Sequence, residues 1–279
     1  MTRRRNVRPV HVVSYAVLVL TALFAILPII WAFLTSLKDR GEILAYPPVF
    51  IPTSMTLENY RSVIFGSGLL NYMFNTMLVA IIAIGIVLIA ASHCAYAVSR
   101  VRFYGRESLM FLILAASMVP LVSLLSPLYL IWSGLGLYDT YRGMALVFAA
   151  WQTPTAVWLI RGFIEAVPYE VEEAAMIDGC SKWKCFYRIV LPVVQPGLVA
   201  TAIVIFIFIW NDFLIATALT ISDSRRLMQV GLYRYLGDLG VDWGRFTAYT
   251  ILSILPVVVV FVTLQKRLIS GLVGGAIKG

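Results

Sequence analysis

Six long stretches of the chain contain no Asp, Glu, Lys or Arg, and they limit the possible fold more than any other feature. Each stretch has at least 18 residues, and a helix that crosses a hydrocarbon layer of about 30 Å needs about 17–25. A transmembrane barrel strand would alternate apolar and polar residues, whereas Val199–Ile209 reads VATAIVIFIFI, apolar on every side. The stretches are Val12–Leu37, Ser62–Ser99, Ser108–Tyr138, Gly143–Ile160, Ile189–Asn211 and Phe246–Gln265. We therefore predict an all-α polytopic membrane protein with six transmembrane helices, the third followed by a short loop within its stretch.

Composition excludes a soluble fold. Hydrophobic residues make up 61% of the 279 residues and charged residues 13%, against about 45–50% and about 25% in ordinary globular domains. So few charges cannot cover the surface of a water-soluble domain of this length.

The distribution of basic residues predicts the orientation. If the N-terminus lies inside, the inner segments hold 14 of the 22 Lys and Arg residues. Because basic residues concentrate in cytoplasmic loops, both termini are expected in the cytoplasm. The basic loops lie next to the spans, so the net charge of +8 does not indicate a nucleic-acid partner. The first apolar stretch exceeds the signal-peptide core of about 7–15 residues, and we expect it to be retained.

The three cysteines do not predict a metal site. Cys180 and Cys185 fall in a cytoplasmic segment, where thiols stay reduced. The two histidines, His11 and His93, lie in or beside other spans, so they are not expected to complete a zinc site with these cysteines.

The cytoplasmic segment between the fourth and fifth spans has a pattern of its own. Pro168 suits the first turn of a helix, and three glutamates follow it near the positive N-terminal end. Gly179 stands where a left-handed residue would end this helix. Ser181 can cap a second short helix, Lys182–Leu191, which Pro192 should terminate. Two short helices are thus predicted to meet at a glycine.

One face of the first short helix carries small side chains, since Val171, Ala174, Ala175 and Asp178 recur at helical spacing. One interpretation is an amphipathic loop on lipid headgroups, but such helices carry large apolar anchors and basic residues. This helix is acidic with two alanines at its centre. The small face therefore favours close approach by another protein.

The same residues resemble a known family. The sequence Glu173-Ala174-Ala175, then Gly179 after three residues and Ile189-Val190-Leu191-Pro192 after nine more, resembles the EAA loop of bacterial ATP-binding-cassette importer permeases. Three further segments resemble the carbohydrate-uptake branch, that of the smaller membrane subunit of the maltose transporter. They are Leu57–Tyr60 (LENY), Trp210–Phe213 (WNDF) and Gln265–Gly279. Asp212 departs from the Glu more common in this branch, but keeps the carboxylate.

The resemblance implies a type I importer permease fold, with residues 1–279 as one transmembrane domain and a coupling loop at about 161–197. It implies that the loop seats in a groove of a cytoplasmic ATPase dimer, that a second permease subunit completes the path, and that an extracytoplasmic solute-binding protein delivers the sugar. ATP and Mg would be bound by the ATPase, and this chain would bind no cofactor. The implied location is the bacterial inner membrane. The coupling residues would be Glu173, Ala174, Ala175, Asp178, Gly179, Ile189, Leu191 and Pro192.

Polar residues inside the spans are candidates for the translocation path, because they cost free energy without a partner. These candidates are Asn75, Gln152, Asn211 and Asp212. For Asn75 and Gln152 the competing interpretation is helix–helix contact. For Asn211 and Asp212 it is that Asp212 marks a helix end and pairs with a neighbouring polar group. Pro120 and Pro127 are expected bend points, and Pro154 is expected to kink the fourth span.

Two other classes of function fit the sequence less well. An intramembrane enzyme would need catalytic groups within reach of one another, and no Ser–Lys or His–carboxylate spacing occurs in the spans. A stand-alone secondary transporter would be polytopic too, but would not need a small-faced cytoplasmic helix. The chain has no Gly-Lys dipeptide and hence no phosphate-binding loop, so ATP would have to bind another chain.

Overall fold

The computed structural model describes residues 9–237 and 240–276, with side chains over 13–237 and 240–265. The chain divides into two compact units. Unit 1 comprises Met1–Leu69 and Leu232–Ile254, and unit 2 comprises Leu70–Gly231 and Leu255–Gly279.

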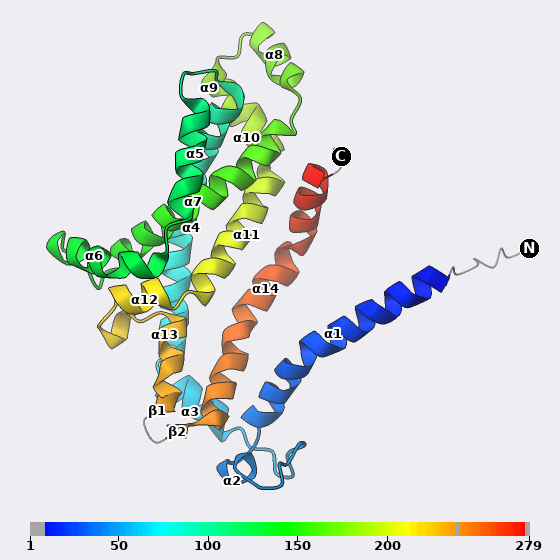
Figure 1. The fold of residues 1–279 in the computed structure, drawn as a ribbon, viewed down its shortest axis with the longest axis vertical. Coiled ribbons are helices and arrows are strands. Elements are labelled where there is room, and N and C mark those ends of the chain that lie inside the picture. Colours follow the sequence, from blue (N-terminus) through cyan, green and yellow to red (C-terminus); the bar gives the residue numbers. More distant parts are fainter. Residues whose placement is uncertain (1–8, 238–239, 277–279) are drawn as a thin grey trace, which may run out of the picture. The chain divides into compact units, whose positions relative to one another are not determined.

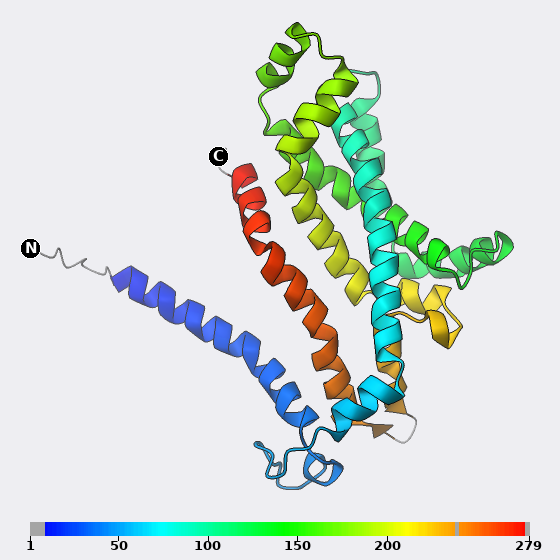
Figure 2. The same ribbon diagram turned by 180° about the vertical axis from the view of Figure 1, so that it is seen from behind.

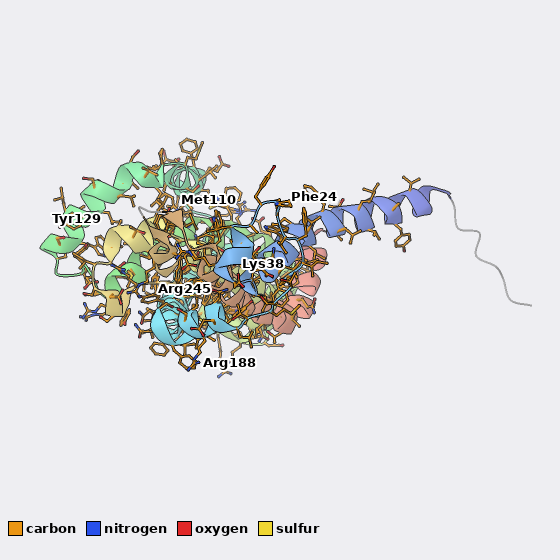
Figure 3. All side chains as sticks on the ribbon, turned by 90° about the horizontal axis from the view of Figure 1, so that it is seen from below. Phe24, Lys38, Met110, Tyr129, Arg188 and Arg245 are labelled. Carbon is orange, nitrogen blue, oxygen red and sulfur yellow. The ribbon has the colours of Figure 1, made fainter. Side chains whose placement is uncertain are left out.

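Unit 1 is built around the C-terminal end of its first long helix. Asn59 Nδ2 donates to the carbonyl oxygens of Ser36 at 3.0 Å and Lys38 at 2.9 Å, which have no partner farther along the helix. Tyr60 hydroxyl contacts Ser36 Oγ at 2.7 Å. The apolar side chains of this helix project outward, as Phe24 does in Figure 3. The elements are α1 (Pro9–Ser36), α2 (Arg40–Ile43), α3 (Glu58–Gly66), η3 (Tyr233–Tyr235), β1 (Leu236–Gly237), β2 (Gly240–Val241) and the first part of α14 (Trp243–Ala276).

The two strands of unit 1 pair antiparallel, with Leu236 opposite Val241 and Gly237 opposite Gly240. The α14 helix begins directly after them, and Asp242 Oδ1 accepts from Arg245 N at 3.2 Å in its first turn. Gly244 lies against Asn59, because a Cβ there would stand 2.8 Å from Asn59 Oδ1.

Unit 2 is a helical bundle in which α7 contacts both α11 and α5 (Figures 1 and 2). Gly197 permits this α7–α11 contact, since a Cβ there would meet the Phe163 ring at 2.3 Å. Its longer helices are α4 (Leu69–Arg100), α5 (Arg106–Ser117), α6 (Leu121–Gly134), α7 (Tyr141–Glu165) and α11 (Gln195–Asn211). The shorter elements are α8 (Tyr169–Ile177), α9 (Lys182–Cys185), η1 (Phe186–Val190), α10 (Leu191–Val193), α12 (Leu214–Leu219), η2 (Asp223–Arg225) and α13 (Met228–Leu232).

Within the described residues, four helices are long and apolar enough to cross a membrane, and six if each of two bent pairs is one span. The four are α1, α4, α7 and α14, and they coincide with four of the predicted stretches. The pair α5 and α6 occupies the third stretch, and the helix from Lys182 to Val193 together with α11 forms the other pair.

The third stretch was wrongly predicted to be one helix and a loop. It forms two helices bent by 91°, with the break at Pro120, which precedes the first residue of α6. Proline cannot continue α5 because it lacks the N–H and clashes with the preceding turn. Pro120 is therefore the bend point that the sequence predicted, whereas Pro127 lies inside α6 and Pro154 inside the unbroken α7.

Candidate functional site

The predicted cytoplasmic helix is present as α8. Pro168 precedes its first residue, and Glu170 and Glu172 lie in its first turn. Gly179 has a φ of +85°. Its N–H bonds to the carbonyl of Met176 at 3.1 Å, and the N–H of Cys180 bonds to that of Ala175 at 3.0 Å. These two bonds form a Schellman motif, so Gly179 ends the helix as the sequence predicted.

The second short helix begins as predicted but continues past its predicted end. Ser181 Oγ accepts from Lys184 N at 3.4 Å and caps α9. The chain then widens into a π-helical turn, in which Leu191 N–H donates to Phe186 O, and α10 continues through Pro192. The wider turn lets Pro192, which has no N–H to donate, stay in the helix. Termination at Pro192 was thus a wrong prediction.

The small face of α8 is divided between the interior and the surface. Val171, Ala174 and Asp178 are exposed, as is Glu173. Ala175, in contrast, is buried at 9% exposure. The expectation that both alanines lie on one contact surface is therefore corrected: Ala175 is covered within the fold, and of the two only Ala174 is exposed.

A large apolar side chain stands at the end of α8, where Ile177 is 87% exposed. Together with the exposed Ala174 and Asp178 of the same helix it forms what we call the α8 surface. Trp183 on α9 is 67% exposed, but its ring lies 6.2 Å from that of His93 on α4. In the later part of the predicted motif, Ile189 and Leu191 are half-buried and Pro192 is exposed.

The opposite side of α8 carries a buried ion pair that sequence patterns do not predict. Arg100, the last residue of α4, donates from Nε to Glu172 Oε1 at 2.6 Å. The two side chains are 11% and 3% exposed. Tyr96 hydroxyl donates to Glu172 Oε2 at 2.9 Å. Arg100 and Glu172 lie 72 residues apart, and neither composition nor periodicity relates them.

Aromatic contacts join α4 to the π-helical turn beside this pair. His93 Nε2 and Tyr187 hydroxyl are 2.7 Å apart. The rings of His93 and Phe186 have centroids 5.0 Å apart, and those of Tyr96 and Phe186 are 4.7 Å apart. His93 therefore belongs to a packing cluster, and no group of three potential metal ligands occurs among the described residues.

Asn75, a candidate for the translocation path, has all its polar atoms engaged within unit 2. Its Nδ2 donates to the carbonyl oxygens of Ser224 and Arg226, both at 2.9 Å, and its Oδ1 accepts from Tyr141 hydroxyl at 2.9 Å. The side chain is fully buried. These bonds fix the loop that carries Ser224 onto α4 and α7.

The other three candidates differ in their surroundings. Gln152 is 5% exposed on α7. Asn211 is exposed and donates to Ile207 O at 2.8 Å in its own helix. Asp212 follows the last residue of α11, and its Oδ1 accepts from the N–H groups of Ile215 at 2.9 Å and Ala216 at 3.1 Å. Asp212 thus marks the end of α11 and caps the start of α12, and none of the four candidates is among the residues that line the described cavities.

Asp139, in the loop between α6 and α7, is a polar centre that sequence reasoning missed. It has a φ of +54°, and its carboxylate accepts from Ser222 Oγ and from the N–H groups of Ile221 at 3.2 Å and Ser222 at 3.3 Å. Arg225 forms an ion pair with it at 3.5 Å. Burial alone would raise the pKa of Asp139, but these bonds and the Arg225 charge together hold that pKa below its usual value.

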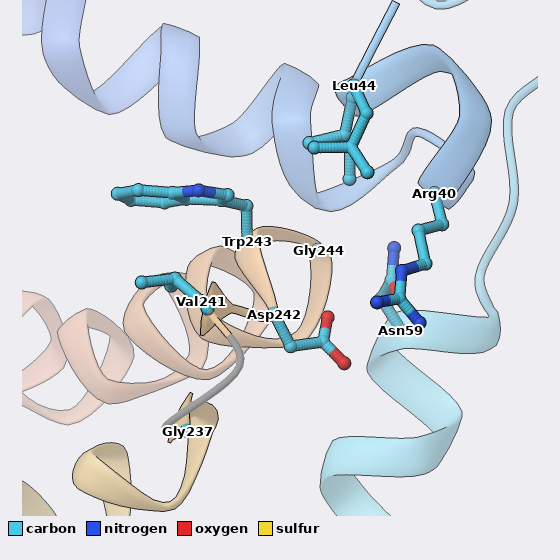
Figure 4. A pocket seen from close by; sticks show the side chains of 10 residues that line it. Arg40, Leu44, Asn59, Gly237, Val241, Asp242, Trp243 and Gly244 are labelled. Atoms are coloured by element: carbon cyan, nitrogen blue, oxygen red, sulfur yellow. The ribbon is translucent and has the colours of Figure 1, made fainter.

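The largest described cavity lies in unit 1 and has a volume of about 580 Å³. Figure 4 shows the indole ring of Trp243 on one side and the Asp242 carboxylate directed toward Arg40 and Asn59 on the other. None of the residues predicted for coupling or translocation is among its described lining residues.

These features define a polytopic α-helical membrane protein with a folded segment between two of its spans. A family model described as "Binding-protein-dependent transport system inner membrane component" matches residues 94–272, which include α8 and the α8 surface. The chain belongs to this family. It is therefore a membrane component of a transport system rather than an enzyme.

Individual relatives cover nearly the whole chain. The sulfoquinovosyl glycerol transport system permease protein SmoH of Agrobacterium fabrum is 31% identical over 272 residues, 98% of this chain and 94% of the relative. The trehalose/maltose transport system permease protein MalG of Thermococcus litoralis is 33% identical over 264 residues, 94% of each chain.

A solved structure supports the fold. A crystal structure of a bacterial ABC transporter involved in the import of the acidic polysaccharide alginate matches with a TM-score of 0.78 and 25% identity, over 95% of this chain and 99% of the other. A methionine ABC transporter structure matches with a TM-score of 0.61 at 14% identity, which shows the same type I permease fold.

Proposed function

We propose that this chain is the permease subunit of an ATP-driven, binding-protein-dependent importer of a sugar or sugar derivative, and that the α8 surface is its docking site for a cytoplasmic ATPase. In this proposal the ATPase supplies ATP and Mg binding, a second permease subunit completes the path, and an extracytoplasmic binding protein delivers the sugar. Residues 1–279 form one transmembrane domain in the bacterial inner membrane, with both termini cytoplasmic.

The exposed face of α8 is the observation that carries the docking proposal. A helix of nine residues that ends in a Schellman turn holds its exposed side chains in a fixed orientation. Ala174 lets a partner backbone approach closely, and Ile177, at 87% exposure, is an apolar anchor with no cover from this chain. Two exposed acidic residues of α8, Glu170 and Glu173, disfavour a position on anionic lipid.

Sugar is the proposed cargo because relatives that match over almost the full length are named as permeases for carbohydrates. The type I fold does not itself select sugars, since the methionine transporter shares it. Uptake by membrane vesicles that contain the complete transporter and internal ATP can test the class. Maltose, trehalose and sulfoquinovosyl glycerol are suitable substrates, with methionine as the control. Uptake of methionine but of no sugar would refute the cargo proposal.

Recovery of partners in mild detergent tests the docking site. We expect an affinity tag on this chain to recover an ATPase and a second permease, and Ile177→Asp to lose the ATPase while keeping the permease. Ile221→Asp is the matched control, because Ile221 is an exposed isoleucine of unit 2 outside the α8 surface. Full ATPase recovery with Ile177→Asp, or equal loss with both variants, would refute the docking site. A C-terminal reporter that is active only in the cytoplasm tests the proposed orientation.

A further inference from the structure

Arg100 joins three segments of unit 2 through one side chain. Its Nε donates to Glu172 of α8, and its Nη2 donates to the carbonyl oxygens of Ile164 at 2.8 Å and Val167 at 2.6 Å. Ile164 lies in the last turn of α7 and Val167 two residues beyond its end, so both carbonyls belong to the segment that leads from α7 to α8. Arg100 is itself the last residue of α4. The guanidinium thus connects the ends of α4 and α7 to the first turn of α8.

The surrounding contacts make this connection rigid. Tyr96, one turn before Arg100 on α4, donates to the second oxygen of the Glu172 carboxylate. The guanidinium carbon of Arg100 lies 5.7 Å from the centre of the Tyr169 ring, at the start of α8. Cys185 Sγ lies 3.8 Å from the Glu172 carbonyl oxygen and ties α9 to the same residue. Both carboxylate oxygens and the guanidinium fork are therefore engaged, and neither side chain is free to rotate.

Stability alone is a poor explanation for such a pair. Removing two charges from water costs free energy that the pair only partly recovers, so buried ion pairs contribute little net stability and serve best to fix an arrangement. The arrangement fixed here is the position of α8. A nine-residue helix is marginal in isolation, and Glu172 holds it from the side opposite Ala174 and Ile177.

We propose that Arg100 is a positioning residue for coupling: it holds α8 to the ends of α4 and α7, so that a displacement of the α8 surface moves these two spans with it. This inference rests on the proposed docking of an ATPase at the α8 surface. Arg100 lies on the far side of α8, beneath the docking face, and acts through Glu172.

The planar fork of arginine is essential to this proposal. Lysine keeps the charge but offers a single point of attachment, so it cannot bond Glu172 and two carbonyls in the same way. Arg100→Lys therefore separates the charge from the three-way connection, while Glu172→Gln keeps the side-chain shape and removes the ion pair. A matched control is Arg161→Lys. Arg161 pairs with Glu165 at 2.7 Å near the end of the same α7, but with 24% and 42% exposed side chains, and such exposed pairs contribute little.

The test uses the complete transporter, purified through a tag on this chain and reconstituted with its binding protein. The readouts are ATPase recovery, ATP hydrolysis, sugar delivered per ATP, and the melting temperature. For Arg100→Lys and Glu172→Gln we expect full ATPase recovery and hydrolysis within about twofold, with sugar per ATP reduced about tenfold or more. Arg161→Lys should match the unmodified protein in all four readouts.

Three results would overturn the proposal. Both variants could deliver normal sugar per ATP; they could lower the melting temperature without changing that ratio, which would make the pair structural only; or they could lose the ATPase, which would make it part of the docking surface. The Ile177→Asp experiment tests docking separately. If Ile177→Asp releases the ATPase while Arg100→Lys and Glu172→Gln import normally, the docking site is supported and the positioning role of Arg100 is refuted.

Discussion

The left-handed turn at Gly179 provides a prediction whose magnitude follows from the structure. A Cβ at Gly179 would meet nothing within 4 Å, so a larger residue there causes no clash. The cost comes from the backbone alone, because a φ of +85° costs an L-residue about 1–2 kcal/mol. If the turn opens instead, two hydrogen bonds of about 1 kcal/mol each are lost.

These two costs are similar, so the outcome depends on the residue. Asparagine tolerates the left-handed region, and Gly179→Asn should retain the turn and near-normal import. Gly179→Ala should retain the turn with strain, whereas Gly179→Val, whose branched side chain tolerates this φ least, should open the turn in a large fraction of molecules. Strain of about 1–2 kcal/mol in the closed turn lowers the free energy of opening by the same amount, so the open turn becomes about 5–30-fold more populated than in the native chain. We therefore expect import to fall in the order Asn, Ala, Val.

The assay is ATP-driven sugar uptake by vesicles, with ATPase recovery measured on the same preparation. Gly105 is the matched control, because it has the same φ of +85° and no atom within 4 Å of a Cβ, but precedes α5 rather than following α8. Gly105→Val should therefore carry equal strain and leave import unchanged. Normal import by Gly179→Val would refute the reasoning. A deficit for Gly179→Asn as large as for Val would show that side-chain bulk, not φ, is responsible.

Three further predictions concern unit 2. Gly197→Ala should destabilise the bundle by about 1–3 kcal/mol, because its Cβ would overlap the Phe163 ring, and lower the melting temperature, whereas Gly162→Ala, with open space around it, should not. The Asp139 carboxyl, whose pKa is lowered on folding, should stabilise the protein above its unfolded value of about 3.9 and lose that contribution as the pH falls through the lower folded value. Asp139→Asn should therefore flatten the fall in melting temperature below about pH 4, and an unchanged profile would contradict this. Asp212→Asn should change import less than Gly179→Val, because Asn Oδ1 can still accept from Ile215 and Ala216, and a specific loss of sugar affinity would instead place Asp212 in the binding site.

The spans could be predicted because their signal is local and repeated. Absence of charge over at least 18 residues has one dominant physical cause, and each predicted stretch overlaps a candidate span or bent pair. The position of the bend in the third stretch was predictable from Pro120, but its angle was not. Whether a proline ends a helix or is absorbed depends on the turns around it: α5 stops before Pro120, whereas a π-helical turn carries the chain through Pro192.

The candidate site shows where sequence reasoning stops. Residues that act on the turn next to them were predictable: Gly179 from its left-handed position, Ser181 from its cap, and Pro168 from the helix start. Which face of α8 would be exposed was not, because the burial of Ala175 depends on how α8 packs in the fold rather than on the period of α8 itself. In the sequence Arg100 is one of many basic residues next to a span, and Glu172 is one of three glutamates near the start of a short helix. Their pairing exists only because the ends of α4 and α7 meet α8. The recognisable motif therefore predicts the turn and the surface that a partner can contact, while the connection that would carry motion from that surface into the membrane lies outside the motif.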